Sequence, residues 1–594
     1  MLKQFRKASR QKDVISSMFL PVAIAMIFTQ LVGVVATIID GLITSIYFGE
    51  EAYSAISLVY PLVNMLVLLA GFISTGCQVV CSKKIGQGKK EEANSTFTAA
   101  IIGGLIVSAI FIFVCIFFPL TMFRICGVTI ENHPEFYIHM SDYLKGYLLG
   151  VPAVMLVQII SPILLIDNNK NLVQISALIL CIADVIGDVT NALVFKGGVY
   201  GMGVATSIAY ILELSIMMFH FIYKRSYFRF DLRSFSMENI QGMIVGGSPT
   251  FVRKLATIIR DIAINRLNLA VALSSAAVVA RGLQNDISLL LFSIGLGIGK
   301  TLITMTGMYY GAKDMQGLKR LYIYAFKVSV IISSITGIIM LVLSYPISKL
   351  YTSDKEVLEY SIFAICCLAI VLPLDTLTVA LQNYLQGIGN LRLVNLMNFG
   401  ERFFIPVITA VMLGIPFGSK GILASIAVGK ILIILLMFVV ICIRRKGLPQ
   451  NINDFMFLPD DFGGSTDCNY YAEINTLDDV MAASIGIKDY CQNNAIDKAK
   501  TTHLSLFIEE MAGNIIKHGI HKKQISVGLR VFISDGQILI TLQDYFNYFD
   551  PTEYYKIMQD KHDGESNGIR IVMKLATEVH YVNAFGINNL MILI

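Results

Sequence analysis

Three acidic residues lie inside apolar stretches of this 594-residue chain. Asp40 falls in VVATIIDGLITSIYFG, and Asp184 and Asp188 fall in ALILCIADVIGDVTNALV. The spacing of four places Asp184 and Asp188 on one face of a helix. A carboxylate in an apolar layer is costly, which makes each acid a functional candidate. Carboxylate oxygens, joined by the hydroxyl of Thr206, suit Na⁺ or a shared proton, so these four residues are the predicted ion-coupling site. The alternative is that the acids cap helix ends or face a polar loop.

A second set of charged residues lies in the later apolar stretches. Arg260, Arg281 and Asp286 are predicted to line a substrate path, and the competing interpretation is Arg–Asp pairing near helix ends. Glu401 and Arg402 are adjacent, so they do not face each other on one helix. An interhelical pair is the expectation there.

The composition indicates which solvent these residues meet. The chain is 55% hydrophobic and only 15% charged, whereas soluble domains are nearer a quarter charged. This excludes a purely soluble enzyme, a disordered chain and a nucleic-acid binder driven by bulk charge. The ten Cys lie mostly in apolar runs without paired CxxC motifs, which predicts neither a metal site nor a disulfide framework. The lipid bilayer is the expected partner, and nucleic acid is not.

Apolar runs long enough to span a bilayer number twelve. Lys and Arg crowd the N-terminus and every second loop, which predicts that both termini are cytoplasmic in a multi-pass plasma-membrane protein. The predicted fold is an all-α bundle of twelve helices in two six-helix lobes. The runs lie at 16–47, 53–81, 97–121, 140–166, 172–195, 199–223, 240–270, 273–309, 322–350, 357–388, 392–414 and 419–443.

The spans repeat internally. Residues 75–93 resemble 300–318, residues 171–189 resemble 390–408, and residues 199–211 resemble 419–431. The nearly constant offset predicts two related halves, at about 14–223 and 238–443. Such repeats are typical of secondary transporters that bind substrate between the halves.

The strings IIDGLITSIYFGEEAYSAISLVYP and DVTNALVFKGGVYGMGVATSIA carry a family resemblance. Residues 1–447 resemble the MATE (multidrug and toxic compound extrusion) transporters. The resemblance implies an antiporter that exports cationic or amphipathic compounds against Na⁺ or H⁺. It also implies that Asp40 and Asp188 bind the coupling ion, with Thr206 at a supporting position. Asp184 departs from the family pattern, which usually has Asn there.

The chain changes character after the last span. Residues 448–466 are rich in Pro, Gly, Asn and Asp and are predicted to form a linker. Beyond it the sequence predicts a small cytosolic α+β domain at 467–594, with helices at 478–494, 497–517 and 567–577. Strands are predicted over 525–534, 537–544, 579–584 and 588–594. From Asp460 onward the chain is net acidic, whereas the remainder is net basic.

Within this domain, HLSLFIEEMAGNIIKHG (503–519) places Glu510, Asn514 and His518 on one helix face. With Asp544 and NGIRIVMKLATEV (567–579), it resembles the GHKL (histidine-kinase-like) ATPase domain of the anti-sigma-factor kinase branch. The resemblance implies that Glu510 is the general base and that Asn514 binds Mg²⁺. It further implies that Asp544 reads adenine and that Gly568 lies by the phosphates of ATP. DYFNYFDP lacks the glycines expected after that Asp, which argues against close backbone approach to a nucleotide.

Three functions remain open. The leading interpretation is a multidrug-type antiporter with a nucleotide-binding-like regulatory domain and a regulatory protein partner. The second is a lipid-linked or polysaccharide flippase, whose anionic substrate would meet Arg260 and Arg281. The third is a membrane sensor whose C-terminal domain is an anti-sigma-type serine kinase, so enzymatic activity is an open question for that domain only.

Overall fold

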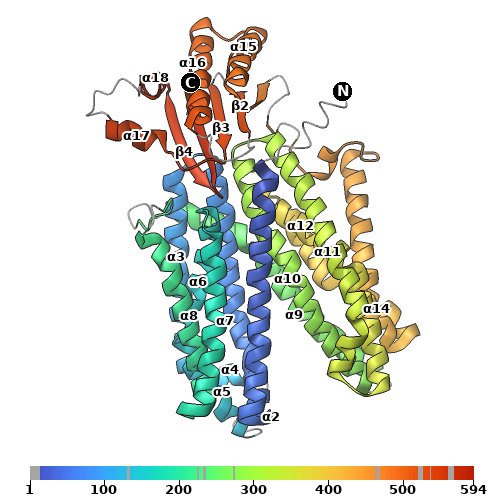
Figure 1. Cartoon of the computed structure of the whole chain (residues 1–594). Coiled ribbons are helices and arrows are strands. Elements are labelled where there is room, and N and C mark those ends of the chain that lie inside the picture. The colour runs from blue at the N-terminus through green and yellow to red at the C-terminus, as the bar shows by residue number, and fades with distance from the viewer. Residues whose placement is uncertain are drawn as a thin grey trace.

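Two helical bundles and a small sheet domain make up the computed structural model (Figure 1). It describes residues 14–126, 128–129, 131, 134–223, 226–231, 236–271, 275–459, 462–463, 468–518, 526–534, 537–558 and 567–594. The bundles diverge toward the bottom of Figure 1, and the sheet lies across their other end. That end is called the sheet end below.

The first bundle is built from the first half of the predicted repeat. Its helices are α2 (Val14–Gly86), α3 (Lys90–Phe117), α4 (Pro119–Ile125), α5 (Pro134–Leu148), α6 (Val151–Ile166), α7 (Lys170–Thr190) and α8 (Gly198–Tyr223). A π-helical turn, η1 (Asn191–Phe195), follows α7.

The second bundle repeats this plan. It contains α9 (Met237–Val271), α10 (Ser275–Gly311), α11 (Met315–Tyr351), α12 (Lys355–Ile388), α13 (Leu391–Phe399) and α14 (Ile405–Arg445). A π-helical turn, η3 (Gly400–Phe404), again interrupts the helix that the repeat equates with α7. Each half therefore carries a π-helical turn at this helix, although by the repeat η3 aligns with residues 181–185 within α7 rather than with η1.

Within the described residues, eight helices are long and apolar enough to cross a membrane, or up to nine if the bent pair α5–α6 is one span. Two of the eight contain a sharp turn at glycine. Gly49 has φ 89° within α2, and Gly418 has φ 60° within α14, a conformation that side chains with a Cβ avoid. The structure thus shows a multi-pass helical protein, and the count of twelve spans stays a prediction.

Part of the predicted linker packs against the helices. After η4 (Ile452–Phe455), the side chains of Met456, Phe457 and Leu458 are buried in the main apolar core. Arg444 donates to the carbonyl of Leu458 over 2.6 Å. The Pro, Gly, Asn and Asp composition predicts a linker, and it carries no signal that the apolar MFL segment packs against the helices.

The C-terminal region is a five-stranded antiparallel sheet with helices on one face. The strands are β1 (Asn469–Ile474), β2 (Val527–Ser534), β3 (Gln537–Asp544), β4 (Glu578–Ala584) and β5 (Ile587–Leu593), in the order β1-β2-β3-β5-β4. The helices are α15 (Leu477–Asn493), α16 (Lys498–His518), α17 (Pro551–Met558) and α18 (Asn567–Leu575). The predicted helices and strands are confirmed, while β1 and α17 were not predicted.

Alternation along the strands divides the sheet into two faces. One face packs beneath α15, α16 and α18 through residues such as Val531, Ile540 and Ile592, all fully buried. The opposite face turns toward the helical bundles, since Val582, Ala584 and Met591 belong to the same core cluster as Leu165 and Ile166. The sheet is therefore covered on both faces.

Candidate functional site

The three predicted acids converge inside the first bundle. Asp40 on α2 and Asp188 on α7 bring their carboxyl groups within hydrogen-bonding reach of each other. Asp184 lies one helical turn before Asp188, and the Thr206 hydroxyl on α8 reaches its carboxyl. The structure thus assembles four residues from three helices that the sequence placed up to 166 positions apart.

These carboxyl groups are buried and short of partners. Asp188 is 1% exposed, and Asp40 and Asp184 are each 8% exposed. Among the residues that the structure describes, both carboxyl oxygens of Asp188 and one each of Asp40 and Asp184 have no hydrogen-bond donor. Unsatisfied buried oxygens are costly, so these acids are the candidates for holding a cation or protons. The interpretation that the acids cap helix ends does not fit this geometry.

The local fold holds the site in place. The carbonyl of Asp40 accepts a bond of 2.8 Å from the Thr44 hydroxyl. Beyond Asp188, the Asn191 side chain accepts from the Gly197 amide (3.0 Å) and donates to the Gly198 carbonyl (2.8 Å). Asn191 thereby ties the end of α7 to the start of α8, which fixes Asp188 relative to Thr206.

The residues predicted for a substrate path do not form one cluster. Arg260 is bonded to its neighbour Asp261 at 2.7–2.9 Å. Arg281 is 3% exposed and donates to Gln284 over 2.6 Å. Asp286 is exposed on α10. Arg260 thus follows the Arg–Asp pairing interpretation, and Arg281 is held within the bundle.

A second buried charge cluster escaped the sequence analysis in part. Lys430 on α14 contacts the carboxylates of both Asp375 on α12 and Glu401 on η3. Arg402 lies 3.4 Å from Glu401 and 3.9 Å from Asp375, and the guanidinium covers the ring of Phe292 at 4.3 Å. The expectation of an interhelical pair for Glu401 is correct, with Lys430 as the partner. Lone charges inside apolar runs were the available signal for Asp375 and Lys430.

In the C-terminal domain the structure brings two predicted residues together. A Cβ on Gly568 at the start of α18 would overlap the Glu510 carboxylate on α16. Asn514 lies one helical turn beyond Glu510 and is half-buried. Asp544 ends β3, on the sheet face that these helices cover, and burial raises the pKa of its carboxyl above the ordinary value.

Asp544 is held by a small polar network. Its Oδ1 accepts from the Phe546 amide over 2.9 Å and from Nδ2 of Asn588 over 2.7 Å. The carbonyls of Phe546 and Asn547 also accept from Asn588. The run DYFNYFDP, which lacks glycine, is thus anchored by a side chain of β5. Asn588 was not among the predicted site residues.

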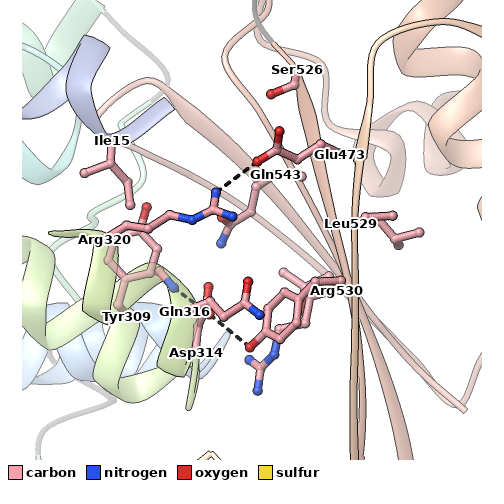
Figure 2. A pocket seen from close by; sticks show the side chains of 15 residues that line it. Ile15, Tyr309, Asp314, Gln316, Arg320, Glu473, Ser526, Leu529, Arg530 and Gln543 are labelled. Atoms are coloured by element: carbon pink, nitrogen blue, oxygen red, sulfur yellow. Dashed lines mark hydrogen bonds and ion pairs between the residues drawn. The ribbon is translucent and has the colours of Figure 1, made fainter. Parts of the chain in front are cut away.

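A cavity of about 350 Å³ lies between the sheet and the second bundle (Figure 2). Arg320 at the start of α11 reaches Glu473 on β1 over 3.1 Å, and the Tyr471 hydroxyl donates to Asp314 over 3.4 Å. Burial is the larger cause that raises the pKa of Tyr471, and the negative charge of Asp314 raises it further. The pKa of Tyr471 is about 12. The walls combine charged side chains with apolar ones such as Ile15 and Leu529, and no sequence motif predicted this interface.

The two helical halves match a known protein family. The MatE family model matches residues 25–193 and 249–412, one segment in each half of the repeat. This chain belongs to the MATE transporter family. The matched segments include Asp40, Asp184 and Asp188 in the first half and Asp375, Glu401 and Arg402 in the second.

Curated relatives of the MATE region are distant. A probable multidrug resistance protein NorM of Photorhabdus laumondii is 21% identical, over 52% of this chain and 72% of that protein. The multidrug export protein MepA of Staphylococcus saprophyticus is 21% identical, over 70% of this chain and 92% of that protein. An FAD transporter of Shewanella oneidensis is likewise 21% identical, over 54% and 71%.

Solved structures share the fold. A MATE crystal structure in the straight conformation matches with a TM-score of 0.68 at 19% identity, over 73% of this chain and 97% of that chain. A MOP-superfamily transporter from Pyrococcus furiosus, described as having a binding pocket of reversed polarity, matches with a TM-score of 0.67 at 18% identity, over 74% and 98%. The MATE fold thus accounts for the helical bundles.

Proposed function

We propose that this MATE transporter is a secondary active antiporter that exports cationic or amphipathic small molecules against a Na⁺ or H⁺ gradient. The observation that carries the proposal is the convergence of Asp40, Asp184 and Asp188, whose buried oxygens lack donors among the described residues. The multidrug exporters among the relatives support this substrate class.

Coupling follows from the charge of this site. A monovalent ion bound between Asp40 and Asp188 offsets one of the two negative charges and relieves the repulsion between the facing carboxyl groups, and its departure restores that repulsion. Because these acids sit on different helices, the two states favour different packings of α2 against α7. The ion and the substrate each bias the equilibrium between inward-open and outward-open states by their differential affinity.

The proposed topology has twelve spans in two six-helix halves. Division of α2 at Gly49 and of the Leu391–Arg445 segment at Gly418, with α5–α6 as one bent span, supports this count. Helix α9 supplies the remaining span, although its charged residues keep its apolar character low. Basic residues at the sheet end, such as Lys84, Lys89 and Arg445, support a cytoplasmic location for that end and for both termini, with the protein in the plasma membrane.

A lipid-linked or polysaccharide flippase is the second candidate. Buried cations in the second half favour it, because Nε of Arg281 and Nε of Arg402 have no acceptor among the described residues. Both are nearly buried, at 3% and 8% exposure. An anionic substrate group would satisfy them. Loss of transport in Arg281→Gln, with binding of cationic dyes retained, would favour this candidate over the first.

For the C-terminal domain we propose a nucleotide-binding-like regulatory role, with a regulatory protein as its partner. Two observations support ATP with Mg²⁺ as the ligand: the Glu510 carboxylate lies directly against Gly568 at the start of α18, and Asp544 holds Oδ1 in a network with Asn588 on the sheet face that α16 and α18 cover. Asn514 would hold the Mg²⁺ ion. ATP would supply a transferable phosphoryl group, and Glu510 would accept a proton from the attacking hydroxyl. Without that transfer the domain would act as a sensor of nucleotide.

The experiment for the antiporter uses inside-out vesicles and a fluorescent cationic dye. Na⁺ and pH gradients are imposed separately on the wild type, Asp40→Asn and Asp188→Asn. The control is Glu50→Gln, an exposed acid on the same helix. Loss of gradient-driven uptake in the two variants but not the control supports the antiporter, and the effective gradient identifies the ion. Uptake that ignores both gradients and survives both substitutions would reject it.

A further inference from the structure

One cross-strand row of the sheet contacts both halves of the transporter. The residue pairing runs Tyr471–Arg530–Thr541–Met591–His580, from the first edge strand to the last. Paired residues on neighbouring strands point to the same face. This row therefore lies on the face that meets the bundles.

At one end the row holds the second half. Arg530 donates from Nη1 to the Ala312 carbonyl and from Nη2 to the Lys313 carbonyl, each over 2.8 Å. These carbonyls follow the last residue of α10, so the guanidinium interacts with the negative end of that helix dipole. Arg530 is only 5% exposed. Tyr471 and Glu473 add the bonds to Asp314 and Arg320 (Figure 2).

At the other end the row holds the first half. Gly88, in the turn between α2 and α3, is so close that an added Cβ would lie 3.0 Å from Cε of Met591 and 3.3 Å from Cβ of His580. The turn between β4 and β5 adds a second contact, because the Phe585 amide donates to the carbonyl of Ile166 over 2.9 Å. The Phe585 side chain is 3% exposed and packs in the same core as Ile166.

A hydrogen-bonded sheet is a stiff spacer. Four strand spacings separate the outer members of the row, roughly 19 Å in all. The turn at Gly88 and the turn at Ala312–Asp314 are therefore held at a fixed separation by one rigid body. Alternating access requires the two halves to rock against each other around a central site.

We infer that the docked C-terminal domain is an autoinhibitory clamp that keeps the sheet end of the two halves together. With the clamp docked, the bundles diverge only at the far end (Figure 1). The transport cycle must release at least one of its two contacts before the sheet end opens. This inference rests on the proposed alternating-access function. The cavity beside Arg320 and Glu473 lies on the side of the clamp that meets the second half.

The test uses two variants of the full chain, one at each contact. Arg530→Gln removes both charged bonds to the second half, and Phe585→Ala removes the buried ring at the first half. Lys488→Gln is the control, because Lys488 is an exposed cation on α15 away from the docking face. Hydrogen exchange is followed by mass spectrometry in lipid nanodiscs, and initial transport rates are measured in vesicles.

The clamp predicts linked behaviour at the two ends. Arg530→Gln should speed exchange about threefold or more both at residues 312–317 and at residues 166–170 in the other half, since local opening of one rigid unit exposes both of its contacts. Exchange within α16 should stay unchanged, which shows that the domain remains folded. The initial transport rate should rise in both variants and stay at the wild-type value in Lys488→Gln.

Two results would overturn the clamp. The first is faster exchange at both contacts without a rise in the initial transport rate, in vesicles in which the wild type transports. The second is faster exchange at residues 312–317 alone, which would show that the sheet does not link the halves. If the wild type itself transports nothing under either gradient, the proposed antiport fails, and the exchange measurement still decides whether the two ends are linked. Phe585→Ala covers the case in which Arg530→Gln unfolds the domain.

Discussion

Asp544 at the end of β3 accepts a hydrogen bond of 2.7 Å from Asn588 on β5. Asn588 is three residues beyond Phe585, whose amide bonds to the first bundle. The proposed adenine-reading residue and the docking turn thus share one short segment of β5. A nucleotide bound by Asp544 would first affect the hydrogen bond between Asp544 and Asn588. This bond is a physical route from nucleotide binding to the clamp.

The Asp544–Asn588 contact predicts a pH-dependent stability change. Asn588→Asp would place two carboxyl groups in contact, leave Asp544 with the Phe546 amide but without its side-chain donor, and destabilise the domain by about 1–3 kcal/mol. Burial already raises the pKa of Asp544, and a second acid raises it further. A carboxyl group whose pKa is raised in the folded domain lowers the free energy of unfolding above that pKa. The stability lost in Asn588→Asp should therefore grow as pH rises through that pKa and shrink in acid.

Thermal unfolding between pH 4 and pH 8, roughly the range over which a buried carboxyl pair titrates, would measure that deficit. Gln537→Glu is the control, because Gln537 is an exposed residue at the start of β3, the strand that ends at Asp544. An Asn588→Asp deficit that is independent of pH would show that the two side chains do not interact in solution.

The acids proposed to couple the ion should contribute unequally to gradient-driven transport. Asp188 faces Asp40 and has both oxygens without a donor, whereas Asp184 is reached by the Thr206 hydroxyl. We therefore expect Asp188→Asn to reduce gradient-driven dye transport by about tenfold or more, and Asp184→Asn by less, because a lost charge-assisted contact is worth roughly 1.5–3 kcal/mol. Initial uptake rates in inside-out vesicles measure both. An equal loss in the two variants would contradict the ranking.

Lys430 should be essential to the second-half cluster. Its removal in Lys430→Met leaves Asp375 and Glu401 buried without the cation that contacts both of them, and breaking a buried pair costs about 3–5 kcal/mol. Thermal unfolding of the purified full chain is the measurement. Adding Asp375→Asn and Glu401→Gln should restore much of the loss, because the uncompensated charges are then gone.

Lys420→Met is the matched control for Lys430. Lys420 also pairs with a carboxylate, that of Glu359 over 2.6 Å, but both side chains are exposed. Exposed pairs contribute little to stability, so this variant should unfold like the wild type. Similar losses for Lys430→Met and Lys420→Met would show that the buried cluster has no special role.

Gly568 tests the nucleotide site. In Gly568→Ala the new methyl would displace the Glu510 carboxylate, which is the flexible end of a long side chain. We expect little loss of stability but weaker binding of a fluorescent ATP analogue to the full chain with Mg²⁺. Gly513→Ala is the control, since a Cβ there meets no atom within 4 Å. Equal binding in wild type and both variants would place the nucleotide elsewhere or exclude it.

Several features could be predicted from the sequence because they depend on local pattern. Apolar runs located the long helices, and the acids within them identified Asp40, Asp184 and Asp188, because an unpaired charge inside a run contrasts with every neighbour. Strict alternation likewise located β2 and β3 in the small domain. Strand β1, with four intermediate positions in succession, and the short helix α17 gave too weak a signal.

Other features depend on contacts between distant segments. Lys430 is a lone charge inside an apolar run, and its two partners became known only when α12, η3 and α14 came together around it. Arg530 reads as a strand cation, and its partners are carbonyls more than 200 positions earlier in the chain. Backbone acceptors have no sequence signature, so no motif could predict this contact.

The sequence by itself therefore determined the membrane-embedded class, the two-fold repeat, the α+β character of the C-terminal region and the acids of the first half. Only the tertiary structure decided that the acids meet, that Lys430 lies between two carboxylates, and that the sheet docks on both halves. The physical reason is that periodicity records which residues meet apolar surroundings, whereas pairing across helices and docking of a domain depend on which surfaces meet in space.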